Sequence, residues 1–507
     1  MGLKGDARTP VLIALILTMA LVAMDTTILA TAIPQVVGDL GEFNRVGWVF
    51  SIYLLAETVT IPIYGKLSDL HGRKPILLFG IVIFLIGSAA SAAAWGMTAL
   101  IVSRAVQGIG GAAISSTVNT IAGDIYTVEE RGRIQGYLAS VWGVSAVIAP
   151  ALGGIFAQYL TWRWIFLVNI PLGIFAFILV ARGLQESVTR REHRIDYAGA
   201  LLILLAAGMF ILGLLEGGSS WPWRSPQSLI IFSIAIAAAM ALPAVERRAR
   251  EPMLPPWVWR ERRIAASAIT SITAGMTVIG LSVYVPNWGQ IVLGLAPVAA
   301  GFVLATMSIT WPLTSSLSAR LYLRIGFRDT ALIGSLFALA SGIGLSTLTA
   351  NASVWQPVVY VGLMGVGMGL IFTPLMVGLQ NTVGWQQRGT LTGALMYARF
   401  FGQSIGAAAF GAIANTMLER NSHQGEIMAL HNSTHAIFLG VLVMAVITVA
   451  VLLNTPRHFP AYVEEVTEPI SEQSKKFEQN QNSKNEGTKI QVHQTSDQDA
   501  PKTLEIE

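Results

Sequence analysis

The feature that most constrains this chain is a series of long apolar segments separated by short charged stretches. A helix needs roughly 20 apolar residues to cross the ~30 Å hydrocarbon core of a membrane, and about fourteen segments are long enough. Because no water satisfies backbone groups inside a bilayer, such segments must form helices. We therefore predict an all-α polytopic membrane protein, with spans at residues 11–33, 46–65, 75–95, 98–122, 134–158, 164–184, 196–216, 227–245, 264–289, 296–319, 328–349, 354–379, 390–417 and 433–454.

The composition agrees with this class and excludes several others. Of the 507 residues, 53% are hydrophobic and 12% are charged, whereas soluble domains carry about 25% charged residues. The net charge of +4 is explained by anchoring at the membrane, because no basic face with interleaved aromatic residues predicts a nucleic-acid partner. The absence of Cys rules out disulfides, thiolate metal sites and cysteine nucleophiles. The first apolar segment lacks a small-residue cleavage site and is interpreted as a retained span.

Basic residues between the segments predict the orientation in the membrane, because cytoplasmic loops carry an excess of Lys and Arg. Alternate loops share that excess, with Lys66, Arg73, Lys74, Arg131, Arg133, Arg190, Arg191, Arg194, Arg247, Arg248, Arg250, Arg260, Arg262, Arg263, Arg320, Arg324, Arg328 and Arg388. The opposite loops contain only Arg45, Arg163, Arg224 and Arg420. We expect a multi-pass protein of the cell (inner or cytoplasmic) membrane, with an even number of spans and both termini in the cytoplasm.

One short loop, residues 65–74, is repeated in a degenerate form. It reads Gly-Lys-Leu-Ser-Asp-Leu-His-Gly-Arg-Lys, and residues 319–328 keep its spacing but lack the first Gly and the Asp. The two copies occupy equivalent places, which predicts two six-helix bundles at 11–184 and 264–454. Residues 196–245 are then two inserted linker helices. The polar residues 461–507 predict a disordered cytoplasmic tail, to which we assign no role.

Several motifs, taken in order, are similar to those of one family. The loop at 65–74 resembles the loop between helices 2 and 3 of the major facilitator superfamily of transporters. Asp25-Thr26-Thr27-Ile28 resembles the first-helix signature of its fourteen-span drug:proton antiporter branch, and Arg104 begins a motif similar to that of helix 4. Pro150, Gly153 and Gly154 resemble the fifth-helix antiporter motif, although Ala149 stands where the family has Gly. The resemblance extends over residues 11–454.

The resemblance implies a fold, a driving force and a set of partners. The fold would be the major facilitator fold, with two six-helix bundles and two inserted helices. The protein would export amphipathic drugs or related small molecules, including cations, in exchange for protons. It would need no cofactor other than the proton gradient, would work in the lipid bilayer, and would act as a monomer.

Four charges lie inside the predicted spans, where each costs roughly 2.5–3.5 kcal/mol on insertion scales, so each should face protein or water. Asp25 is the first candidate for a proton-carrying acid, with Thr26 beside it in the cavity. Arg104 would assist proton release, by resemblance. The alternative for both residues is a structural ion pair. Arg399 is a cavity candidate for which we expect a structural or gating role before a substrate contact.

Glu57 belongs to a polar stripe on one helix face. Tyr53, Glu57 and Thr60 follow helical spacing, which places them on a common face. An acid beside an aromatic ring suits a cavity for lipophilic cations, through charge and cation–π contact. The sequence therefore makes Glu57 a second candidate for proton coupling and a substrate contact. The alternative is a hydrogen-bonded structural carboxylate.

Asp69 differs because it lies at the membrane edge. The resemblance gives it a switching role, in which it pairs with a basic residue of its own half and with the N-terminal end of a helix from the other half. A carboxylate near a helix N-terminus gains about 0.3–1 kcal/mol, enough to bias an equilibrium without locking it. Gly65, Gly72, Arg73 and Lys74 would share this role. The alternative is a simple turn cap.

Two other functions stay open at this point. One is export of a specific metabolite, lipid or peptide by the same fold, and the other is a non-transporting sensor or scaffold that binds through its tail. No metal-ligand grouping and no Ser/His/Asp arrangement supports an enzyme.

Overall fold

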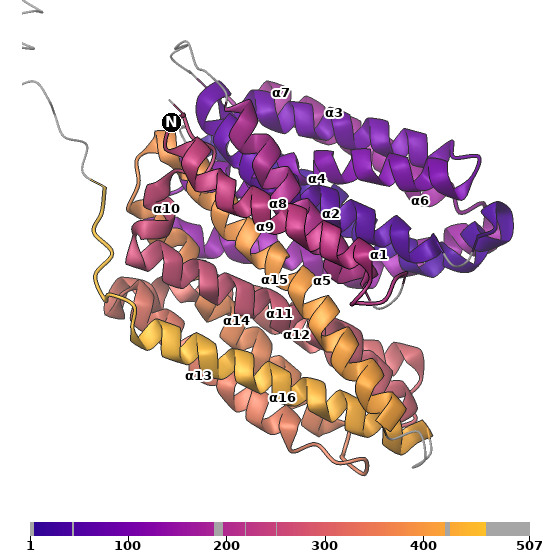
Figure 1. Ribbon diagram of the computed structural model, residues 1–507. Helices are drawn as coiled ribbons and strands as arrows, with labels where there is room; N and C mark the ends of the chain where they lie inside the picture. Colours follow the sequence, from indigo (N-terminus) through magenta and orange to yellow (C-terminus); the bar gives the residue numbers. More distant parts are fainter. Residues whose placement is uncertain are drawn as a thin grey trace, which may run out of the picture. The chain divides into compact units, whose positions relative to one another are not determined.

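A computed structural model describes residues 5–42, 45–186, 196–217, 220–249, 251–420 and 426–462. These residues are helical apart from turns and one isolated bridge between Gly217 and Trp221, which confirms the predicted all-α class. Residues up to Ala461 form one compact unit, and Figure 1 follows its helices in chain order. The predicted boundaries between the two bundles and the linker stay a prediction.

The first group of helices, which we call the N-terminal group, fills the predicted region 11–184. It comprises α1 (Gly5–Leu40), α2 (Val46–His71), α3 (Arg73–Ala92), α4 (Met97–Ile125), α5 (Val128–Tyr159), α6 (Trp164–Leu167) and α7 (Asn169–Gly183). Helix α4 packs against α2 and α3, and α1 packs against α5 and α7. Two buried clusters hold the group together, one around Phe84 and one around Trp162.

The linker and the C-terminal group follow. The linker helices are α8 (Tyr197–Glu216) and α9 (Pro226–Glu246), and a short α10 (Pro256–Arg260) leads into the C-terminal group. That group comprises α11 (Arg262–Ile291), α12 (Pro297–Ile325), α13 (Phe327–Ser346), α14 (Trp355–Asn381), α15 (Trp385–Arg420) and α16 (Glu426–Leu453). Helices α8 and α9 pair with each other, and α8 also touches α2 and α15, with Phe210 and Phe401 5.5 Å apart between ring centroids.

Local sequence explains where several helices begin. Thr127 and Glu130 form a capping box at α5, in which each side chain accepts a hydrogen bond from the other residue's backbone N–H. Ser225 caps α9, and Pro226 follows at its first turn, where a missing N–H costs nothing. These signals set the helix starts, while apolar packing decides which helices meet.

The predicted count of fourteen spans is not confirmed. Within the described residues, twelve helices are long and apolar enough to cross a membrane, judged by length and composition. Helices α12 and α15 coincide with the predicted spans 296–319 and 390–417 but are not among the twelve. Both carry many polar side chains, such as Thr310 on α12 and Arg399 on α15. Contacts with neighbouring helices, not apolarity alone, accommodate these side chains.

The two groups meet along two helix pairs, α2 with α15 and α5 with α12. Gly65 permits the first contact, because a Cβ atom at this position would lie only 2.6 Å from the carbonyl oxygen of Gly389. Gly143 permits the second, because a Cβ there would lie 2.6 Å from the carbonyl oxygen of Ser308. Side chains longer than hydrogen would therefore push the groups apart.

Polar contacts between the groups gather at one end of the bundle, which we call the Asp69 end. Here Arg388 donates to Asp124 at 2.6 Å, and the Tyr322 hydroxyl donates to the carbonyl oxygen of Val128 at 2.5 Å. At the opposite end, Trp162 and Arg163 donate to Asp39 within the N-terminal group, at 2.9 and 3.0 Å, and both bonds lower the pKa of Asp39. In this structure the Asp69 end is closed.

The two copies of the loop motif share a backbone conformation. Gly72 joins α2 to α3 with φ 94°, and Gly326 joins α12 to α13 with φ 92°. Positive φ is strained for residues with a Cβ, so both turns need glycine. The resemblance between residues 65–74 and 319–328 therefore extends to geometry.

Two predictions lie outside the described residues. The basic loop with Arg190, Arg191 and Arg194 falls within residues 187–195, and the predicted tail falls almost entirely within residues 463–507.

Candidate functional site

Asp25 lies in the core of the N-terminal group and is fully hydrogen-bonded. Arg104 donates to one carboxylate oxygen at 2.5 Å, and Gln107 and Asn169 donate to the other at 2.7 and 3.2 Å. Ser88 completes the network by accepting from the same two amides. Both charged side chains are buried, so the pair is compensated without contact with the C-terminal group.

Arg104 is held from several sides. Its guanidinium also donates to the side-chain oxygen of Gln107 at 2.6 Å and lies 4.3 Å from the ring centroid of Tyr53. The hydroxyl of Thr26, predicted to face the cavity, donates to the backbone oxygen of Ala23 in its own helix at 3.0 Å.

Glu57 contrasts with Asp25, because one of its oxygens is unpaired. Ser115 donates to Oε1 at 3.0 Å, while Oε2 is buried without a hydrogen-bond partner. The Tyr53 hydroxyl beside it is also buried and unpaired. Gly111 on α4 leaves room for the side chains of Tyr53 and Glu57. A Cβ atom at Gly111 would lie 2.6 Å from the Tyr53 hydroxyl and 3.8 Å from the Glu57 carboxyl carbon. A buried polar atom without a partner is costly and commonly marks a functional place.

Thr60, the third residue of the predicted polar stripe, is bonded within its own helix, and its role in the cavity stays a prediction. Its hydroxyl donates to the backbone oxygen of Ala56 at 2.6 Å, in its own helix. Its hydrogen-bonding capacity is therefore partly used locally, which is common for Thr within helices.

Arg399 lies on α15, the helix of the C-terminal group that packs against α2, which carries Glu57. Its guanidinium carbon is 5.0 Å from the ring centroid of Trp311 and 5.0 Å from that of Phe372. Its Nε is buried without a hydrogen-bond partner. The C-terminal group thus holds a cation between aromatic faces, a favourable position for a guanidinium.

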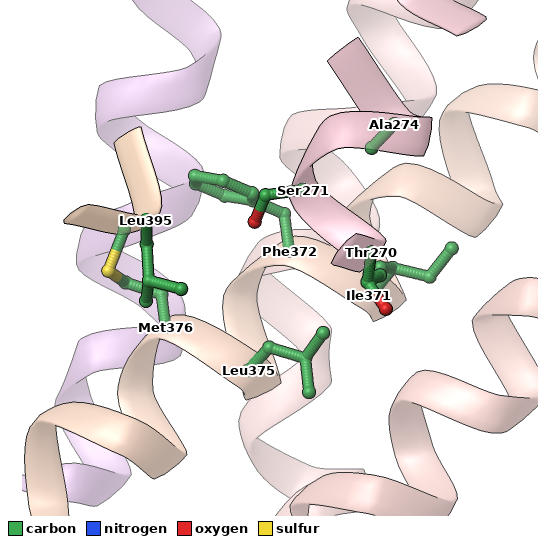
Figure 2. Close-up of a pocket in the computed structure, with 8 residues that line it drawn as sticks. All are labelled: Thr270, Ser271, Ala274, Ile371, Phe372, Leu375, Met376 and Leu395. Carbon is green, nitrogen blue, oxygen red and sulfur yellow. The ribbon is translucent and has the colours of Figure 1, made fainter. Parts of the chain in front are cut away.

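A small pocket lies beside this cation, between α11, α14 and α15. Its lining is mainly apolar and comprises Thr270, Ser271, Ala274, Ile371, Phe372, Leu375, Met376 and Leu395. Figure 2 shows the α11 side chains on one side of it and Leu395 of α15 across from them. Phe372 connects the pocket to Arg399, because its ring lies against both.

Asp69 joins the two groups directly. Its carboxylate pairs with Arg73 at 2.8 Å within the N-terminal group. It also accepts hydrogen bonds from the backbone N–H groups of Gly389 and Thr390, at 2.8 and 2.6 Å, and from the Thr390 hydroxyl at 2.7 Å. These donors lie near the N-terminal end of α15, where the helix dipole favours an anion. The role of Asp69 in switching stays a prediction.

The other residues of the predicted switch extend this contact. Arg73 donates to Asp124 at 2.9 Å and to the backbone oxygen of Trp385 at 2.5 Å, and its guanidinium carbon lies 3.8 Å from the Trp385 ring centroid. Lys74 donates to the backbone oxygen of Ala181 at the end of α7, at 2.7 Å. Arg73 therefore spans the interface, whereas Lys74 is tied to its own group.

The predicted antiporter motif lies within α5, which continues unbroken through Pro150. Gly153 is buried. Gly154 has free space around it, since a Cβ atom at this position would meet no atom within 4 Å. The side chain of Pro150 lies outside the described side chains.

Sequence reasoning missed three residues of this arrangement. Trp311 and Phe372 were not singled out because aromatic residues in apolar spans are common, and only packing reveals that both face Arg399. Asp124 was missed because it ends a span as an ordinary boundary charge. Its pairing with both Arg73 and Arg388 appears only in the packed structure, because these residues are far apart in the sequence.

A bundle of apolar helices in two contacting groups, with compensated charges in its core, is the architecture of a polytopic membrane transporter. The model of the Major Facilitator Superfamily matches residues 15–407. The chain belongs to this superfamily, as its motifs suggested. The family and its fold are those of transporters and not of enzymes, and its members typically need no cofactor.

Several curated relatives are multidrug transporters by name. The chain is 35% identical over 404 residues to "Multidrug resistance protein 3" of Bacillus subtilis, covering 80% of this chain and 79% of that protein. It is 32% identical over 412 residues to "Multidrug transporter protein MdtP" of the same organism, covering 81% and 76%. Among solved structures, the human organic anion transporter MFSD10 matches with a TM-score of 0.64 and 14% identity, covering 89% of this chain and 100% of that one, which shows the fold alone.

Proposed function

We propose that this protein is an antiporter that exports amphipathic drugs or related small molecules, cations included, in exchange for protons. It would act in the cell membrane as a monomer, with both termini in the cytoplasm. The observation that carries the proposal is the unpaired, buried carboxylate oxygen of Glu57 on α2, a helix that packs against α15 of the other group. The names of the relatives support a drug as the substrate.

The two buried acids differ in what protonation would cost them. A proton on Asp25 would weaken an ion pair with Arg104 and two amide hydrogen bonds. A proton on Glu57 can bind the unpaired Oε2 and leave the hydrogen bond from Ser115 to Oε1 in place. We therefore assign proton exchange to Glu57 and keep Asp25 and Arg104 as the pair that responds to it through Tyr53.

The closed Asp69 end gives the proposal a direction. By the positive-inside rule this end lies in the cytoplasm, because Lys66, Arg73 and Arg388 are found there. The structure would then correspond to a state closed toward the cytoplasm. Export requires this closure to form after a substrate has entered and to open again for the next cycle.

The proposal can be tested by ethidium efflux from cells that express the protein. We expect several-fold lower ethidium accumulation than in cells with an empty vector, because the pH gradient drives export. Collapse of the whole proton-motive force with a protonophore should raise accumulation to the level of vector cells treated in the same way. Accumulation equal to the vector throughout would contradict drug export, and efflux that survives the protonophore would contradict proton coupling.

A further inference from the structure

The degenerate copy of the loop motif also lies at a contact between the two groups. The first copy contacts the start of α15, and the degenerate copy, residues 319–328, contacts the start of α5. Gly389 and Gly132 are each the fifth residue of these two helices. A Cβ atom at Gly389 would lie 2.6 Å from the carbonyl oxygen of Gly65, and one at Gly132 would lie 2.7 Å from the Cβ of Ala319. The backbones therefore approach each other closely at both contacts, in corresponding places.

The degenerate copy lacks the two ionic side chains that join the groups at the first contact. Leu323 stands where the first copy has Asp69, and Phe327 stands where it has Arg73. Neither of these apolar side chains can form a hydrogen bond or an ion pair. At the second contact, a polar link between the groups has to come from another residue of the loop, and Tyr322 provides one.

Tyr322 donates to α5 at the place where Arg73 donates to α15. The Tyr322 hydroxyl bonds to the backbone oxygen of Val128 at 2.5 Å. Arg73 bonds to the backbone oxygen of Trp385, also at 2.5 Å. Val128 and Trp385 are the first residues of α5 and α15, so corresponding carbonyl oxygens accept the two bonds.

The ring of Tyr322 is held in place by its own group. Its side chain is buried, and Phe327 stacks on it with 4.9 Å between ring centroids. Ala319 and Val377 pack in the same apolar cluster, against which Val128 of α5 also lies. The hydroxyl is therefore aimed at the other group by a fixed ring, and it loses its protein partner if α5 and α12 separate at this end.

We propose that Tyr322 is a positioning residue that closes the Asp69 end at this second contact, as the uncharged counterpart of the link made by Asp69 and Arg73. The proposal rests on the opening and closing of this end that the proposed export function requires. A neutral hydrogen bond shifts an equilibrium about two- to tenfold. Tyr322 would thus favour closure and still allow the end to open.

Distances between two spin labels test this role in the purified full chain in lipid nanodiscs. The chain has no Cys, so labels attach only at Arg133→Cys on α5 and Gln387→Cys on α15, two exposed positions of opposite groups. Tyr322→Phe removes the hydroxyl and keeps the ring. We expect it to lower the ratio of the closed to the open population at least twofold. The same substitution is also measured together with Asp69→Asn, where a smaller closed population makes the change easier to detect.

Tyr126→Phe is the matched control, because it removes a buried hydroxyl at the same end of the molecule. The Tyr126 hydroxyl donates to the backbone oxygen of Arg8 within the N-terminal group, at 3.4 Å, so its loss should leave the label distances unchanged. A ratio that changes less than twofold for Tyr322→Phe in both backgrounds would overturn the proposal, and so would an equal change in the control. The distances are measured without substrate or a gradient, so their failure is distinguishable from a failure of export in the ethidium assay.

Discussion

Replacing Arg104 with Met is expected to destabilise the protein strongly. The substitution leaves the Asp25 carboxylate buried without its ion-pair partner, which lies at 2.5 Å, and also removes the contact with the Tyr53 ring. Breaking a buried ion pair by removing one partner costs about 3–5 kcal/mol. Met fills a similar volume, so the loss comes mainly from charge and not from a cavity. Thermal unfolding of the purified protein in detergent should show a clearly lower midpoint.

The double variant Asp25→Asn/Arg104→Met provides the control. Removing both charges leaves a neutral amide that can still bond to Gln107 and Asn169. We expect it to recover most of the lost stability, because the cost of the single variant is the uncompensated charge. If the double variant is as unstable as Arg104→Met, the pair does not account for the effect and packing around Arg104 does.

Asp69→Asn is expected to slow transport about tenfold or more while leaving insertion into the membrane intact. The Asn amide places N–H groups where Asp69 now accepts bonds from Gly389, Thr390 and Arg73. Hydrogen bonds to a charged group are each worth about 1.5–3 kcal/mol, and about 1.4 kcal/mol corresponds to tenfold in an equilibrium. The state closed at the Asp69 end should therefore become less populated. Initial rates of efflux from proteoliposomes measure this effect.

Asp329→Asn is the matched control for that variant. Asp329 lies one residue after the degenerate copy of the loop at 319–328 and pairs with Arg328, at 2.8 Å, inside the C-terminal group. Among the described residues its ion-pair partners are Arg328 and Arg457, neither of them in the N-terminal group, so its loss should leave the rate nearly unchanged. Equal slowing in both variants would indicate a general effect of loop charge. An Asp69→Asn variant within twofold of the wild-type rate would remove the switching role.

The sequence was sufficient for the class of fold and for the charges that need explanation. Length and apolarity identify membrane helices because a bilayer leaves the backbone few other conformations. Asp25, Glu57, Arg104 and Arg399 attract attention because charges in apolar spans are costly. The number of spans is harder to predict, because α12 and α15 carry polar side chains that contacts with neighbouring helices compensate. Neither helix is among the twelve that are apolar enough to count as a span.

Partners within the site could not be predicted from the sequence. Helical spacing places Tyr53, Glu57 and Thr60 on one face, but it does not tell which groups face them. Only packing separates the compensated Asp25 from the partly unpaired Glu57, two acids that look alike in a sequence. The same holds for Arg399, whose aromatic neighbours come from two other helices.

The central claim is that substrate movement is exchanged for protons through Glu57. Proteoliposomes with a trapped pH-sensitive dye and a saturating internal substrate test it most directly. As substrate leaves through the wild-type protein, protons should enter and the interior should acidify, whereas Glu57→Gln should release substrate with no pH change. Substrate that leaves through wild type without acidification, or acidification that persists in Glu57→Gln, would contradict the account.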